Sequence, residues 1–157
     1  SMNIYFKLII CIVICLSIGS VSGYLTANEI PTWYSTLNKP SFNPPNWIFA
    51  PVWTTLYVFM AIALWLVWKS DVSSTIKNTA IFIFAIQLIL NFFWSIIFFS
   101  FHQLGFSMIE IALLWIFILI SIIKFYPISA TGAYLLIPYL LWVSFASVLN
   151  YALWKLN

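Results

Sequence analysis

Three polar side chains, Gln87, Asn91 and Ser95, recur at a spacing of four within a long apolar segment. Residues four positions apart lie on the same face of an α-helix. An amide surrounded by hydrocarbon costs free energy unless it is hydrogen bonded, so this face is expected to point toward other helices. The strip either joins helices by hydrogen bonds or lines a ligand cavity, and the spacing allows both interpretations.

Large aromatic rings occupy two further predicted helix faces. Trp53 and Tyr57 are four residues apart, and Trp142, Ala146 and Asn150 follow the same spacing. The small side chain of Ala146 leaves a hollow beside Trp142. Aromatic faces stack on flat ring systems, and indoles are redox-active neighbours for a bound ligand. Together the three faces predict a mostly aromatic small-molecule pocket with a few polar groups, or else an aromatic-rich packed bundle.

The sequence lacks the residues that several other common chemistries require. His102 is the only histidine, there are three acidic residues in total, and no glycine-rich phosphate loop occurs. Hydrolysis, metal catalysis, phosphoryl transfer and proton-driven pumping are therefore not expected, and neither is a permanently bound cofactor. Glu110, inside an apolar segment, is expected either to reach the membrane interface or to pair with a polar neighbour.

The composition places the chain in a membrane. It has 157 residues, of which 64% are hydrophobic and 6% charged, whereas an ordinary soluble domain is about a quarter charged. The six lysines are scattered singly, which argues against a nucleic-acid partner. Residues 1–157 therefore predict one transmembrane domain in contact with a lipid bilayer, and Ser1, before Met2, is expected to be a cloning remnant.

Five apolar segments approach the roughly 20 helical residues that cross a bilayer core. They cover residues 4–27, 47–68, 79–101, 106–125 and 130–156. Because the segments are continuous rather than alternating, they predict an all-α bundle of five transmembrane helices and exclude a β-barrel. An odd number of spans puts the termini on opposite sides, and the lysine distribution favours a cytoplasmic N-terminus. Pro138 should kink the last span.

The segment 28–46, between the first two spans, is dense in proline and aromatic residues. Proline fixes φ and lacks an N–H donor, so the segment should be stiff. Its aromatic side chains predict a semi-rigid lid that lies on the bundle. Asn46 is expected to cap the following helix. The GxxxG of Gly19 and Gly23 predicts close helix packing, either within the chain or in a dimer.

Three blocks, spread over nearly the whole chain, carry a specific resemblance. They are Trp33-Tyr34, Leu37, Lys39-Pro40, Pro44-Pro45, Trp47, Pro51-Val52-Trp53-Thr54 and Leu56-Tyr57; then Leu90-Asn91, Trp94 and Phe98-Phe99; then Pro138-Tyr139-Leu140, Trp142, Phe145-Ala146, Leu149-Asn150-Tyr151 and Trp154. In order and spacing these blocks resemble the translocator protein family, also called tryptophan-rich sensory proteins or peripheral benzodiazepine receptors. A bacterial member, in the bacterial cell membrane, is expected.

The resemblance implies a homodimeric five-helix bundle whose cavity is closed by the first loop. It implies binding of porphyrins and of isoquinoline- or benzodiazepine-type drugs. In bacterial members it also implies light-driven oxidative breakdown of protoporphyrin, which makes porphyrin a ligand or substrate. Transport of porphyrins across the membrane and a sensory role toward a partner remain alternatives.

The resemblance and the helix faces together supply a set of candidate site residues. Trp53 and Trp142 are implied as the paired cavity indoles, with a role in photooxidation, and Lys39 is expected to meet a porphyrin propionate. The full set of expected ligand-binding residues is Tyr34, Lys39, Pro44, Trp53, Tyr57, Gln87, Asn91, Ser95, Trp142 and Ala146. A sterol-recognition pattern also matches at Leu149, Tyr151 and Lys155, but such patterns are weak, and cholesterol is discounted as the physiological ligand.

Overall fold

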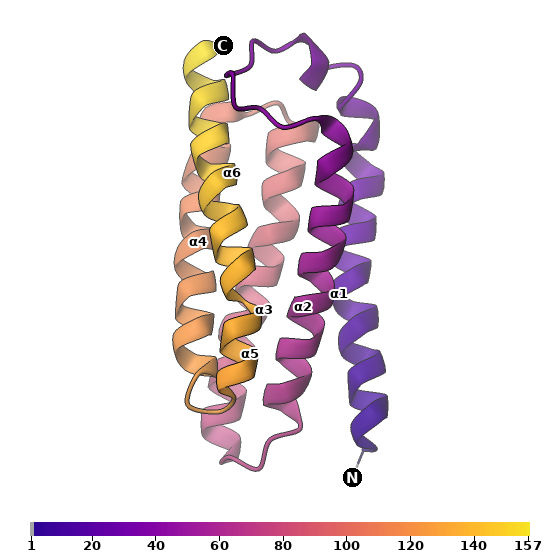
Figure 1. Cartoon of the computed structure of the whole chain (residues 1–157), viewed down its shortest axis with the longest axis vertical. Coiled ribbons are helices and arrows are strands. Elements are labelled where there is room, and N and C mark those ends of the chain that lie inside the picture. The colour runs from indigo at the N-terminus through magenta and orange to yellow at the C-terminus, as the bar shows by residue number, and fades with distance from the viewer. Residues whose placement is uncertain (1) are drawn as a thin grey trace.

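The computed structural model describes residues 2–157, so Ser1 lies outside the described residues. Five long helical segments run roughly along one axis, and the termini lie at opposite ends (Figure 1). The segments are α1 (Ile4–Thr26) with η1 (Ala27–Glu29), η3 (Asn46–Ile48) with α2 (Phe49–Trp68), α3 (Ser74–Ser95) with η4 (Ile96–Ser100), α4 (Leu104–Phe125), and α5 (Ala130–Leu135) with α6 (Ile137–Leu156). No strand occurs within residues 2–157. The predicted all-α bundle of five spans is confirmed.

Length and apolarity explain why these segments are helical. They contain 22 to 27 residues each, with mean hydropathy between 1.7 and 2.6, long enough to cross a hydrocarbon core about 30 Å thick. A helix satisfies its own backbone hydrogen bonds, which lipid does not. Only 11% to 39% of the residues in each apolar window are buried inside the bundle. The remaining outer surface suits lipid contact.

Some helix boundaries differ from those expected. The third helix begins at Ser74 rather than at residue 79, because the hydroxyl of Ser73 accepts a hydrogen bond from the Ile76 backbone. The fourth begins at Leu104. The expectation that Asn46 caps the second helix is wrong, since η3 opens after Pro45 and neither η3 nor α2 has a side-chain cap.

Proline interrupts the last span as predicted. α5 ends at Leu135, α6 begins at Ile137, and Pro138 is in the first turn of α6. Proline has no N–H to bond to the preceding turn, and its ring crowds the carbonyl there. The expected kink is therefore a break between two helices, with Leu136 at the junction.

The lid, residues 28–46, is structured and lies across one end of the bundle, at the top of Figure 1. Tyr34, in the turn η2 (Tyr34–Thr36), is only 1% exposed. Its hydroxyl donates a hydrogen bond of 2.7 Å to Oδ1 of Asn43, within the lid. Its ring lies 5.6 Å from that of Phe99 and 6.5 Å from that of Phe49. Tyr34 thus anchors the lid in the bundle.

Two sets of contacts hold the lid at its edges. The Asn38 backbone N–H donates to Oδ1 of Asn157 at 3.0 Å, and Nδ2 of Asn157 donates to the Asn38 carbonyl at 2.9 Å. We call this pair the Asn38–Asn157 clasp. In the second set Trp33 stacks on His102, with centroids 4.2 Å apart, and a ring nitrogen of His102 lies 2.8 Å from a carboxylate oxygen of Glu29. The lone histidine is thereby part of the lid's support.

Ionisation of Tyr34 provides a test of how firmly the lid is seated. Burial raises the pKa of Tyr34 to about 12, against about 10 for an unperturbed tyrosine. Because the folded-state pKa is raised, the stabilisation by the neutral phenol is complete below about pH 10 and is lost as the pH rises to about 12. We expect the tyrosinate absorbance difference between the wild type and Tyr34→Phe to titrate near pH 12. A difference that titrates near pH 10 would contradict the buried lid contact.

Substitution of the two glycines of the GxxxG pattern is predicted to have opposite effects on stability. A Cβ on Gly19 would lie 2.5 Å from carbons of the Tyr57 ring, whereas a Cβ on Gly23 would meet nothing within 4 Å. Gly19→Ala should therefore lower the free energy of unfolding by about 1–3 kcal/mol, the usual cost of overpacking. Gly23→Ala, the matched control, should leave it unchanged or raise it by up to about 1 kcal/mol through better helix propensity. Thermal unfolding in one detergent compares them; equal effects of the two substitutions would contradict the packing argument.

Candidate ligand-binding cavity

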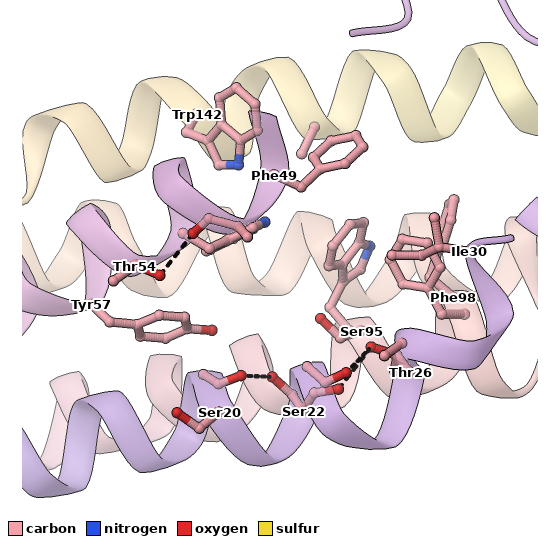
Figure 2. A pocket seen from close by; sticks show the side chains of 18 of the residues that line it. Ser20, Ser22, Thr26, Ile30, Phe49, Thr54, Tyr57, Ser95, Phe98 and Trp142 are labelled. Carbon is pink, nitrogen blue, oxygen red and sulfur yellow. Dashed lines mark hydrogen bonds between the residues drawn. The ribbon is translucent and has the colours of Figure 1, made fainter. Parts of the chain in front are cut away.

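A cavity of about 550 Å³ lies between α1, α2, α3 and α6 beneath the lid (Figure 2). This volume is typical of small-molecule sites, which range from about 300 to 1,000 Å³. Its wall is mainly aromatic and aliphatic, and no charged side chain lines it. The lining residues are Leu16, Gly19, Ser20, Ser22, Gly23, Thr26, Ala27, Ile30, Tyr34, Phe49, Ala50, Trp53, Thr54, Tyr57, Trp94, Ser95, Phe98, Phe99, Trp142, Phe145, Ala146, Leu149 and Asn150.

Helical spacing brings the aromatic wall together. On α2, Phe49, Trp53 and Tyr57 are four residues apart and line one face of the cavity. Across it on α6, Trp142 lies one turn before Ala146. The Trp53 and Trp142 rings are 6.5 Å apart and nearly perpendicular, at 87°. Edge-to-face contacts of this kind stabilise an aromatic cluster while leaving ring faces available to a ligand.

Trp142 offers the cavity a free hydrogen-bond donor. Its indole nitrogen is buried and has no hydrogen-bond partner in the described part of the chain. Figure 2 shows this nitrogen turned toward the interior of the pocket. A buried N–H without a partner costs about 1–3 kcal/mol. A ligand with an acceptor atom at this point would recover that cost.

The polar strip of α3 mostly lies behind the cavity wall. The hydroxyl of Tyr57 donates to Oδ1 of Asn91, and Nδ2 of Asn91 donates to the Tyr139 hydroxyl at 2.8 Å. The Tyr139 hydroxyl in turn donates to Oε1 of Gln87 at 2.6 Å. Gln87 and Asn91 do not line the cavity, whereas Ser95 does. Gln87 and Asn91 therefore fit the first interpretation, since they join helices by hydrogen bonds. Ser95 fits the second, since it lines the cavity.

The predicted lid residues separate into two groups. Tyr34 lines the cavity, but Lys39 and Pro44 do not. The Lys39 ammonium lies 5.1 Å from the centre of the Tyr34 ring and donates to the Leu37 carbonyl at 3.2 Å. Lys39 is therefore separated from the cavity by one aromatic ring.

The sterol-recognition pattern is divided between two environments. Leu149 is buried and lines the cavity. Tyr151 is 48% exposed, and the Lys155 ammonium lies over its ring and that of Trp154, at 5.9 and 5.5 Å. The three residues of the pattern thus do not share one surface.

Glu110 follows neither expectation. It is buried, and neither carboxyl oxygen has a hydrogen-bond partner among residues 2–157. It belongs to the inward face of α4, together with Ser107, Ile111 and Leu114. The carboxyl group is therefore held inside the bundle without a hydrogen bond to it from the described residues. It is also outside the cavity lining.

Two groups of lining residues escaped the sequence analysis. The first is the α1 wall, including Gly19, Ser20 and Gly23, whose small residues signalled helix packing instead. The second is Phe98 and Phe99, which lie in η4, a π-helical turn that extends α3. π-helical turns are frequent at functional sites, but the apolar sequence carries no sign of one.

Comparison with known proteins agrees with this arrangement. The sequence pattern of the TspO/MBR family matches residues 11–155. A tryptophan-rich protein TspO from Chlorobaculum tepidum is 42% identical over 150 residues, which are 96% of this chain and 95% of that protein. A protein of the same name from Archaeoglobus fulgidus is 40% identical over 158 residues, 99% of each chain. The translocator protein of Homo sapiens is 38% identical over 126 residues, 80% of this chain and 75% of that protein.

The match begins within α1 and covers the lid, the next three spans and nearly all of the last, and the related chains are similar over most of their lengths. The predicted resemblance and the predicted membrane location are confirmed. The chain is an integral membrane protein that belongs to the TspO/MBR family.

Proposed function

We propose that this protein binds a tetrapyrrole such as protoporphyrin in the cavity and promotes its light-driven oxidative breakdown. The observation that carries the proposal is the uncharged aromatic cavity of about 550 Å³, with the perpendicular pair Trp53 and Trp142 in its wall. A porphyrin is a flat aromatic ring system, and stacking on aromatic side chains is its natural mode of binding. The unpartnered N–H of Trp142 adds one directional contact.

The same indoles suit the proposed chemistry. Light would excite the bound porphyrin, and dioxygen would be the oxidant that adds to the macrocycle. Trp53 on α2 and Trp142 on α6 both line the cavity. Their proposed role is to hold the macrocycle in one orientation, so that the photoactivated dioxygen adds at one position of the ring. No permanently bound cofactor is needed, because the ligand itself absorbs the light.

Other ligands and partners follow from the family and the cavity. Isoquinoline- and benzodiazepine-type molecules are uncharged aromatic compounds, and we propose that they occupy the same cavity. A homodimer in the bilayer remains a prediction from the family resemblance. The alternatives of porphyrin transport and of sensing through a partner would use the same bound state.

The propionates of a porphyrin need a cationic partner outside the aromatic wall. No charged side chain lines the cavity, and burying an unpaired carboxylate is costly. Lys39 is the nearest candidate on the lid, because its ammonium lies over the ring of Tyr34, a lining residue. We propose that it leaves the Leu37 carbonyl to pair with a propionate.

Substitution of Trp142 tests the binding and the chemistry together. Protoporphyrin should quench tryptophan fluorescence saturably, and Trp142→Phe should weaken binding by about 0.5–1.5 kcal/mol, or about 2- to 12-fold in Kd. It should also slow the bleaching of porphyrin absorbance in light. Trp154→Phe, at an exposed position outside the cavity, is the matched control. The absence of saturable quenching would contradict the proposed binding, and unchanged bleaching by Trp142→Phe would contradict the role of Trp142.

Substitution of Lys39 tests the propionate contact. Lys39→Gln should weaken the binding of the dicarboxylate by about 1 kcal/mol, the upper range for an exposed ion pair, or about fivefold in Kd. The dimethyl ester of the same porphyrin has no carboxylate and should bind the variant and the wild type equally. Equal weakening of both ligands would show that Lys39 acts on the lid and not on the propionate.

A further inference from the structure

The exposed part of the cavity wall is confined to one seam of the bundle. Of all the lining residues, five are exposed, and every one belongs to the segment formed by α1 and η1 or to α2. They are Ser20, Gly23, Ala27, Ala50 and Thr54. All five have small side chains. The first three follow one edge of the α1–η1 segment, and the last two follow one edge of α2 at a spacing of four.

The opposite wall shows that facing the cavity does not by itself make a residue exposed. Trp94 on α3, and Ala146, Leu149 and Asn150 on α6, line the same space and are all buried. The five exposed lining residues are therefore gathered on the segment formed by α1 and η1 and on α2, in the lid-proximal half of the membrane spans.

Gly23 is the residue whose identity the packing does not explain. A Cβ there would meet nothing within 4 Å, and its φ is not positive, so neither a close contact nor the backbone requires glycine. Glycine weakens a helix relative to alanine. Gly19, one turn earlier, differs because the Tyr57 ring fills the space beside it. The Tyr57 ring thus lies beside Gly19, whereas open space lies beside Gly23.

At the lid end, in contrast to the edges of α1 and α2, the cavity is closed by contacts of the lid with the bundle. Tyr34 fills the space beneath the lid, and the Asn38–Asn157 clasp ties the lid to the end of α6. Entry through the lid would break these contacts, whereas entry through the seam breaks none of them.

We propose that the cavity is loaded from the bilayer through a lateral portal between α1 and α2, defined by Ser20, Gly23, Ala27, Ala50 and Thr54, with Gly23 as its gate. This inference rests on the proposed function, because it concerns the route of the same flat, lipid-soluble ligand. Such a ligand concentrates in the hydrocarbon phase before it meets the protein. A planar ring enters edge-on between helices whose facing side chains are small. A large side chain at position 23 would obstruct this route while leaving the aromatic binding wall on α2 and α6 intact.

Binding kinetics of the full chain in lipid nanodiscs test the portal. Protoporphyrin association and dissociation are followed by stopped-flow fluorescence for the wild type, Gly23→Leu and Gly23→Phe. A gate residue raises the barrier in both directions, so both rate constants should fall by about tenfold or more, with a smaller change in Kd than in either rate. Val21→Phe places the same phenyl ring at an exposed position of α1 outside the cavity and should leave both rates unchanged.

Loosening the lid distinguishes the two routes. Asn157→Ala removes the side chain of the clasp and should leave the association rate unchanged. Faster association in Asn157→Ala together with unchanged rates in Gly23→Phe would overturn the portal in favour of the lid. A weaker Kd with an unchanged association rate in Gly23→Phe would also overturn it, since position 23 would then be part of the bound state. If the wild type shows no saturable binding at equilibrium, the proposed function fails.

A second measurement decides the portal without porphyrin. Lipids brominated on their acyl chains quench tryptophans that the chains approach. The quenching due to Trp53, taken as the difference between the wild type and Trp53→Phe, should fall when Gly23→Phe is added and should not fall with Val21→Phe. A Trp53 contribution that is absent in the wild type, or insensitive to Gly23→Phe, would contradict an opening to the bilayer.

Discussion

Four helices meet at the side chain of Tyr57. Its ring occupies the space that Gly19 of α1 leaves, and its hydroxyl donates to Asn91 of α3, which is bonded to Tyr139 of α6. In hydrocarbon no water competes for these polar groups, so each must find its partner within the bundle. Tyr57 therefore links α2 to α1, to α3 and, through Asn91, to α6. The same ring is part of the cavity wall, which couples the packing of the helices to the shape of the site.

This arrangement divides the bundle into two halves with different contents. Toward the N-terminal end, α1 packs on α2 around small buried residues, including Cys11 and Cys15. Toward the lid, the helices enclose the cavity, and the π-helical turn η4 supplies Phe98 and Phe99 to its wall. The lid covers this end, and the exposed small residues of the cavity lining belong to α1, η1 and α2.

Much of the site could be predicted from the sequence, but not which inward-facing residues line the cavity and which lie behind its wall. Trp53, Tyr57, Trp142 and Ala146 were expected in the cavity from helical spacing, and all four line it. Gln87 and Asn91 shared the same signal but lie behind the wall. A spacing of four residues indicates only that a helix face points inward. An inward face meets either another helix or an open space. Which of the two it meets depends on the neighbouring helices.

The sequence by itself determined the class of the protein, the number of spans and the break at Pro138, because apolar length and missing backbone donors act locally. Its ordered blocks of tryptophan, proline and asparagine also determined the family. Only the tertiary structure decided that Gly19 makes room for a ring while Gly23 borders an open cavity, that Glu110 is buried without a partner, and that Lys39 is separated from the cavity by Tyr34. These outcomes depend on contacts between segments far apart in the chain, and no local pattern specifies them.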